Sequence, residues 1–136
     1  MLARAPSHPR LLRELARAAL AFRPPGPIRL ALGGALDPKR EALAPVVLTA
    51  RVLGAAAACP VTGTLARLES ARAAGLLGPD LAREAAGAWS FLSALHRRTA
   101  PGTLRPGRLP PDDRAGLRRA LDAARRLQDA TARLLG

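Results

Sequence analysis

Aromatic residues are nearly absent from this sequence of 136 residues. It has no Tyr, two Phe (Phe22 and Phe91) and one Trp (Trp89), although 49% of its residues are hydrophobic. A core must therefore be built from Ala, Leu and Val, whose small side chains favour close packing of helices. A chain of this length can bury about 65–70% of its unfolded surface as one domain. We expect a single domain over residues 1–136.

Cysteine is limited to Cys59, which excludes an internal disulfide, a cysteine-based zinc cluster and a C-x-x-C redox pair. A reducing compartment such as the cytoplasm fits this usage. The longest charge-free run, residues 52–66, is interrupted by Gly and Pro, and a membrane-spanning helix needs about 20 apolar residues. The N-terminal residues also lack the apolar stretch of a secretion signal. We expect a cytoplasmic protein without a membrane segment.

Acidic residues are few: the chain has 10 Asp and Glu against 22 Lys and Arg, a formal net charge of +12. Such an excess suggests a polyanionic partner. Only Lys39 is a lysine, and so strong an Arg preference beside many Ala, Gly and Pro residues is also typical of a GC-rich genome. Aromatic platforms for stacking bases are missing as well. We therefore do not expect nucleic acid as the partner.

Five segments have the apolar spacing of helices. The first, residues 9–22, places Leu11, Leu15, Ala18 or Ala19, and Phe22 on one face, and the prolines after it must end it. Further helices are predicted over residues 43–58 and 65–74, from Gly78-Pro79-Asp80 onward, and after the loop at residues 100–111. Residues 28–35 are predicted to be irregular or briefly extended. The pattern predicts an all-α bundle of about five helices, with residues 1–8 disordered.

Catalytic motifs are missing too. The sequence has no phosphate-binding loop, dinucleotide-binding motif, nucleophile elbow or H-E-x-x-H pair. Adjacent Asp112 and Asp113 fit the positive end of a helix better than a metal site, because neighbouring side chains on a helix diverge. We therefore predict no catalytic residue and no metal ligands in this chain, and no activity when it is alone.

Arg51 is the only charged residue between Glu41 and Arg67, in the middle of an otherwise apolar predicted helix. A buried guanidinium requires a partner. One interpretation is a structural ion pair with a nearby carboxylate, and the other is a cleft that takes an anionic ligand. The candidate carboxylates for the ion pair are Asp37, Glu69 and Glu84.

Thr64 and Arg67 lie at the predicted start of the next helix. Free backbone N–H groups at such a position favour anions. Thr64, or Thr62, can equally serve only as the helix cap. Both interpretations of Thr64 stay open at the level of sequence.

From about residue 24 onward, several short pieces follow one another in an order that resembles a known family. They are Pro24-Pro25, Asp37-Pro38-Lys39-Arg40, Ala44-Pro45-Val46-Val47, Ala50-Arg51-Val52-Leu53, Thr64-Leu65-Ala66-Arg67-Leu68, Gly75-Leu76-Leu77, Ala88-Trp89-Ser90-Phe91-Leu92 and Leu127-Gln128. The family is the C-terminal substrate-binding domain of bacterial polymerase-beta-like nucleotidyltransferases. The sequence departs from the family pattern at Gly63, where Asn is usual, at Pro38, where Leu is usual, and at Thr99-Ala100, where His-Gln is usual.

The resemblance implies a helical region that accompanies a catalytic domain similar to the uridylyltransferase of the PII signalling protein. In that family, cystathionine-beta-synthase-type or cyclic-nucleotide-binding regulatory domains often come first. The catalytic domain uses an Asp-x-Asp pair to hold Mg²⁺ beside the nucleoside triphosphate, and this chain has no Asp-x-Asp. The expected partner is therefore a catalytic domain, in a separate chain or in a missing N-terminal part, and Mg²⁺ and nucleoside triphosphate are expected only there.

The resemblance also suggests a substrate site. Lys39, Arg51, Thr64 and Arg67 would line a cleft, where arginines orient an acidic acceptor or nucleotide phosphates. The implied function is a non-catalytic substrate-binding or auxiliary domain of a nucleotidyltransferase. The alternatives are a small Arg-rich nucleic-acid-binding protein and a helical protein-interaction module.

Overall fold

The structure is a computed structural model that describes residues 9–99 and 102–135. Its helices are α1 (Pro9–Leu20), α2 (Pro27–Ala31), α3 (Ala44–Ala56), α4 (Thr64–Ala73), α5 (Pro79–Thr99) and α6 (Pro111–Leu135), with a π-helical turn η1 (Pro38–Leu43) and a 3-10 turn η2 (Pro106–Arg108). The described residues hold no strand, only an isolated bridge between Leu36 and Leu104. The all-α prediction is confirmed. The prediction for residues 1–8 concerns residues outside the described part.

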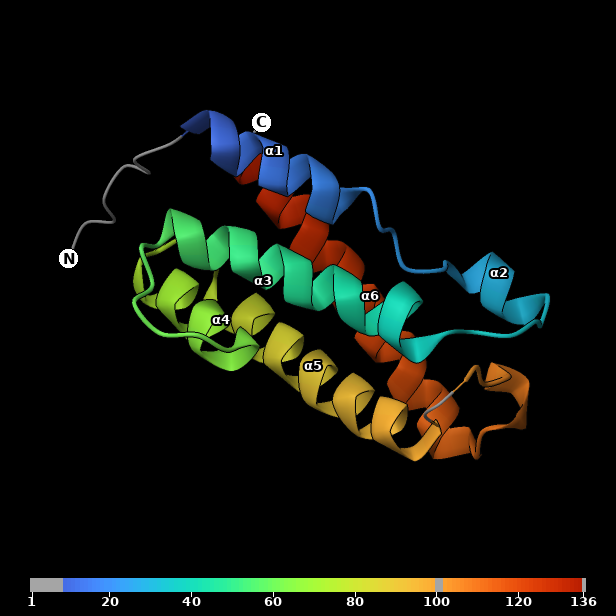
Figure 1. The fold of residues 1–136 in the computed structure, drawn as a ribbon. Helices are drawn as coiled ribbons and strands as arrows, with labels where there is room; N and C mark the ends of the chain where they lie inside the picture. Colours follow the sequence, from blue (N-terminus) through green and yellow to red (C-terminus); the bar gives the residue numbers. More distant parts are fainter. Residues whose placement is uncertain (1–8, 100–101, 136) are drawn as a thin grey trace.

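Helix α3 is the centre of the bundle. It contacts α1, α4, α5 and α6, and α5 and α6 pack along each other. Figure 1 shows α1 on one side of α3, α4 and α5 on the other, and α6 crossing behind it in this view. The core is made of Leu, Ala and Val, as the composition requires; its largest fully buried members include Leu53, Leu92, Leu121 and Leu127. Small residues let these helices approach closely.

A π-helical turn that the sequence analysis did not predict, η1, leads directly into α3. The Asp37 side chain starts this turn by accepting hydrogen bonds from the backbone N–H groups of Lys39 (3.0 Å) and Arg40 (3.3 Å). Pro45 has no N–H group, so the regular hydrogen-bond ladder is interrupted near the wider π turn. The predicted start near Leu43 is confirmed to within one residue, since α3 begins at Ala44; the π turn before it was not predicted.

The buried face of α1 differs from the predicted one. The structure buries Leu12, Ala16 and Ala19, which pack with Val52 and Ala56 of α3. Of the predicted face, Ala19 is buried, whereas Leu11, Leu15 and Phe22 are about half exposed. The helix is thus rotated by roughly a quarter turn about its axis from the orientation that the large side chains predict. Small Ala side chains form the contact because they allow α1 to lie close to α3.

Residues 27–31 form a short helix, although irregular or extended backbone was predicted there. Pro27 occupies its first turn, where the fixed φ of proline suits a helix and the missing N–H costs nothing. The helix ends at Ala31, two residues before Gly33 and Gly34, which both have positive φ. It exposes Ile28 and Leu32 almost fully.

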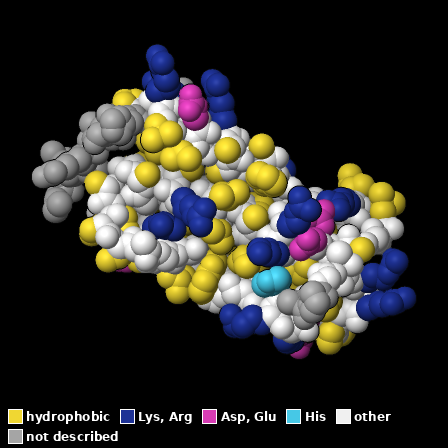
Figure 2. All heavy atoms as spheres, viewed as in Figure 1, with side chains coloured by type: hydrophobic (Ala, Val, Ile, Leu, Met, Phe, Trp, Pro, Cys, Tyr) yellow, Lys and Arg dark blue, Asp and Glu magenta, His cyan; other side chains and the backbone are white. Residues whose placement is uncertain are grey.

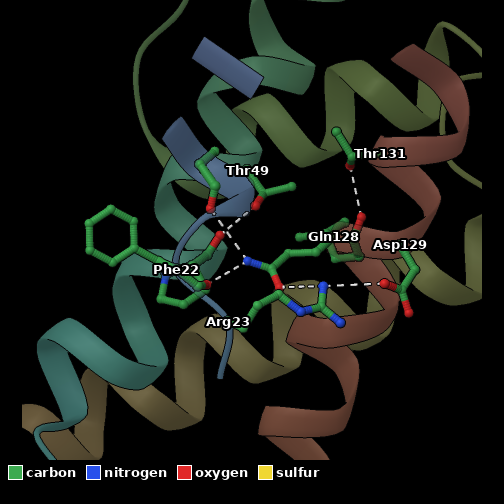
Figure 3. A network of polar contacts seen from close by, with 9 residues as sticks. Phe22, Arg23, Thr49, Gln128, Asp129 and Thr131 are labelled. Atoms are coloured by element: carbon green, nitrogen blue, oxygen red, sulfur yellow. Dashed lines mark hydrogen bonds and ion pairs between the residues drawn. The ribbon is translucent and has the colours of Figure 1, made fainter. Parts of the chain in front are cut away.

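The end of α1 and the helix α6, more than 100 residues apart in sequence, meet in one polar network (Figure 3). The fully buried Gln128 of α6 donates to the carbonyl oxygens of Phe22 (2.7 Å) and Ala19 (3.4 Å) and accepts from Arg23 (2.9 Å). Arg125 donates to the carbonyl of Pro25 at 3.0 Å. The network satisfies carbonyl groups at the end of α1. It fixes the proline-containing connection to α6.

Candidate functional site

Arg51 lies on the solvent-facing side of α3, and it has no ion pair within the described part of the chain. All three carboxylates that could have paired with it have other partners. Asp37 starts η1, Glu69 binds Arg72, and Glu84 binds Arg126. The structure therefore does not support the internal ion pair for Arg51.

Glu69 shows how completely one of these carboxylates is engaged. It lies on α4 and accepts a hydrogen bond from Nε of Arg72 at 2.8 Å. This hydrogen bond, with the positive charge of Arg72, holds the pKa of the Glu69 carboxyl below its usual value. Because Arg72 is three residues further along the same helix, the pair is local to α4. Glu69 is thus committed to Arg72.

Arg67 reaches the same side of the molecule from α4. Its aliphatic stem lies against Gly54 of α3: a Cβ atom built on Gly54 would lie 2.7 Å from Cγ of Arg67 and 3.0 Å from its Cβ. Gly54 and Arg51 are three residues apart on α3 and so share one face of that helix. The structure therefore brings Arg51 and Arg67 to one surface, and Figure 2 shows Lys or Arg side chains gathered over α3 and α4.

Thr64 is the first residue of α4 and is 8% exposed. The cap position belongs to Gly63, whose φ of 107° is a conformation that suits Gly and few other residues. No side chain accepts from the N–H groups of the first turn at this cap. The prediction of a threonine cap at Thr64 is wrong, because the sharp turn at Gly63 already places Thr64 inside the helix.

Lys39 does not join the two arginines. It lies exposed in η1, at the far end of the same continuous helix. Twelve residues separate it from Arg51, which corresponds to about 18 Å along a helix axis. The structure thus separates Lys39 from the set that the sequence grouped together.

Two hollows of the described surface lie elsewhere. One of about 430 Å³ lies between α5 and α6, and one of about 570 Å³ lies between α2, η2 and α6. Neither is lined by Lys39, Arg51, Thr64 or Arg67. Arg51 and Arg67 therefore belong to an open surface and do not line either hollow. We call this surface the α3–α4 surface and define it by Arg51, Gly54, Thr64 and Arg67.

Gly54 is the residue of this surface that sequence reasoning missed. A glycine inside a helix weakens that helix, so its presence often marks a close approach of another element. It stands three residues after Arg51 in an otherwise apolar segment. That position was the available signal, but the sequence alone does not show which side chain fills the space.

Within the part of the chain that the structure describes, no three His, Cys, Asp or Glu side chains lie close enough together to hold a metal ion. Cys59 accepts a hydrogen bond from Oγ of Ser70 at 3.1 Å. Asp112 and Asp113 lie in the first turn of α6, as predicted, and Asp113 pairs with Arg98. These carboxylates therefore sit where the helix dipole favours them.

Comparison with known families decides what kind of domain this is. Residues 9–134 match the family described as "Putative nucleotidyltransferase substrate binding domain". The chain belongs to this family. The match includes α1, so this substrate-binding domain extends further toward the N-terminus than the resemblance from residue 24 onward indicated. Searches of curated proteins and of solved structures gave no match.

None of the helices that the structure describes in this substrate-binding domain combines the length and the apolar character needed to cross a membrane.

Proposed function

We propose that this substrate-binding domain holds an anionic part of the substrate on the α3–α4 surface and acts beside a nucleotidyltransferase catalytic domain. The substrate part is an acidic acceptor or the phosphates of the nucleotide. The catalytic domain, in another chain or another part of the protein, is similar to the PII uridylyltransferase and supplies Mg²⁺ and nucleoside triphosphate. A bacterial, cytoplasmic setting is part of the proposal, based on the resemblance and on the cysteine usage.

The observation that carries the proposal is the pairing of two arginines from different helices on one surface. Arg51 has no acidic partner among the described residues, and the stem of Arg67 is held against Gly54. Two neighbouring guanidinium groups repel each other. An anion between them removes that repulsion and receives hydrogen bonds from both, which is the usual role of Arg in binding phosphate or carboxylate.

The start of α4 adds to this surface. Its first N–H groups have no side-chain cap and lie at the positive end of the helix dipole. Thr64 begins the helix three residues before Arg67, so both lie on the first turns of α4. Lys39 is left out of the site because of its distance along the helix.

The chain itself is not proposed to catalyse transfer. Its sequence lacks the Asp-x-Asp pair of the catalytic domain, and most described carboxylates are engaged in ion pairs with arginines. What its residues supply is orientation: guanidinium groups from two different helices hold the anionic group in one position.

Inorganic tripolyphosphate is a suitable probe for this surface. Calorimetric titration should show binding to the unaltered chain and at least about a tenfold loss of affinity in the double variant R51Q/R67Q, because hydrogen bonds to charged groups contribute about 1.5–3 kcal/mol each. The control variant R13Q/R17Q removes two exposed arginines of α1 and the same charge. Equal losses in both variants would show unspecific attraction by net charge and would contradict the site.

A further inference from the structure

The hollow of about 570 Å³ between α2, η2 and α6 is lined by apolar and basic residues. Its lining is formed by Pro27, Leu30, Ala31, Pro106, Gly107, Pro111, Arg114, Leu117 and Arg118. Most of these are aliphatic or proline side chains. The volume lies within the range of sites that take small ligands or side chains, about 300–1,000 Å³. This concave, mostly apolar surface is far in sequence from Arg51 and Arg67.

Two arginines border this hollow. Arg114 and Arg118 are exposed, lie one turn apart on α6, and have no ion pair within the described residues. Like charges at this spacing repel each other along a helix. The nearest acidic residues in sequence are Asp112, Asp113 and Asp122; Asp113 pairs with Arg98, and Asp122 pairs with Arg125 and Arg126. The two guanidinium groups are thus available to a second molecule.

Two large apolar side chains are exposed on α2 and directly after its end, outside the lining of the hollow. Ile28 is 77% exposed and Leu32 is 82% exposed, more than any other large hydrophobic residue among those described. They lie four residues apart, at the spacing of one helical face. Figure 2 shows hydrophobic side chains gathered over α2, with Lys or Arg side chains along the loop that precedes α6. Apolar and basic groups therefore meet at this end of the bundle.

We propose that this surface, the α2–α6 groove (Ile28, Leu30, Leu32, Arg114, Leu117 and Arg118), docks an acidic segment of a partner protein that also carries large aliphatic side chains. The aliphatic side chains enter the hollow and cover Ile28 and Leu32, while the carboxylates of the segment pair with Arg114 and Arg118. Charge complementarity selects an acidic segment, since the chain carries a net charge of +12. A concave apolar floor fits inserted side chains better than the flat surface of a bilayer.

The probe for this groove is a fluorescent 16-residue peptide that repeats Leu and Glu at helical spacing, measured by anisotropy against the whole chain. Two comparison peptides separate the contributions: one has Lys in place of Glu, and one has Gln in place of Leu. The Leu/Glu peptide should bind at least tenfold more tightly than either. Equal binding of the peptide without Leu would show that charge alone acts, and would overturn the proposal.

The variant R114E/R118E should weaken binding of the Leu/Glu peptide at least tenfold, and it should leave folding intact because both side chains are exposed and surface substitutions change stability little. The matched control R13E/R17E reverses two exposed arginines with the same spacing on α1 and should change affinity less than threefold. The variant I28S/L32S should also weaken binding at least threefold. Equal effects of R114E/R118E and R13E/R17E would overturn the proposal.

Vesicles of phosphatidylcholine with one third phosphatidylglycerol test the competing occupant. The proposal expects that cosedimentation of the chain with these vesicles, if any occurs, is the same for the unaltered chain and for R114E/R118E. Vesicle binding that depends on Arg114 and Arg118, together with absent peptide binding, would assign the groove to an anionic membrane surface and overturn the protein-segment proposal. Tripolyphosphate binding at Arg51 and Arg67 is a separate measurement, so either proposal can fail without the other.

Discussion

Gly54 of α3 lies directly beneath the side chain of Arg67 of α4, so close that a Cβ atom on Gly54 would stand 2.7 Å from Cγ of Arg67. This contact does two things. It lets α3 and α4 approach closely, and it holds the stem of Arg67 on the face of α3 that also carries Arg51. The contact therefore links the packing of the bundle to the proposed binding surface.

Replacing Gly54 with Ala should destabilise the protein, although Ala favours helix. The added methyl group meets the base of the Arg67 side chain, which cannot move away as its tip could, and such overpacking costs about 1–3 kcal/mol. Gly87 on α5 has no atom within 4 Å of the place of its Cβ, so Gly87→Ala should instead stabilise by up to about 1 kcal/mol. Urea unfolding of both variants measures this difference. Equal stabilisation in both would contradict the close contact.

Gln128 offers a test of the polar network in Figure 3. Gln128→Leu keeps the volume but leaves the carbonyl oxygens of Phe22 and Ala19 without their amide donor, which should lower the free energy of unfolding by about 1–3 kcal/mol.

The matched control for Gln128→Leu is Thr131→Val, one turn further along α6. The buried Thr131 hydroxyl only bonds the carbonyl of Leu127 in its own helix. That carbonyl keeps its place in the helical ladder when the hydroxyl is lost, so a smaller loss, below about 1 kcal/mol, is expected. A Gln128→Leu variant as stable as Thr131→Val would show that the network contributes little.

The sequence was sufficient for the five longer helices, but not for the short helix α2 or for all of the helix contacts. Periodicity placed α4, α5 and α6 well, because their apolar residues repeat at helical spacing. It misassigned the buried face of α1, since large Leu and Phe side chains carry most of the apolar signal whereas Ala16 and Ala19 make the contact. The spacing of apolar residues does not show how closely two helices pack, and the close approach of α1 to α3 requires small residues.

The candidate site stays a prediction. The isolated position of Arg51 in an apolar helix predicted a polar surface, and in the structure Arg51 is exposed on the side of α3 where Gly54 contacts the stem of Arg67. Lys39 was grouped with them by resemblance alone, and the length of the helix separates it. The contacts of Gln128 with Phe22 and Ala19 span more than 100 residues, and no local pattern predicts such pairing.

Replacing Arg51 with Met should leave stability nearly unchanged. Its side chain is exposed and has no acidic partner in the described residues, and such surface substitutions change stability by about 0.5 kcal/mol or less. A buried ion pair would instead cost about 3–5 kcal/mol on removal of one partner. Urea unfolding distinguishes the two values. A loss of about 3–5 kcal/mol in the free energy of unfolding would show that Arg51 has a structural role.

The purified chain should transfer no nucleotide. Incubation with radiolabelled nucleoside triphosphate and Mg²⁺, with and without an acidic acceptor protein, is expected to give no labelled product, because the sequence lacks the Asp-x-Asp pair. The positive control is an intact nucleotidyltransferase under the same conditions. Labelling that persists through repurification and increases with the concentration of this chain would refute a non-catalytic role.

Amide chemical shifts during titration with tripolyphosphate test the central claim most directly, because they locate the bound anion. The account predicts that the largest shifts fall on residues 51–54 of α3 and 64–67 of α4, and that they vanish in R51Q/R67Q. Largest shifts on α1, on the α2–α6 groove, or spread evenly over the exposed arginines would contradict the assignment of the substrate surface to Arg51 and Arg67.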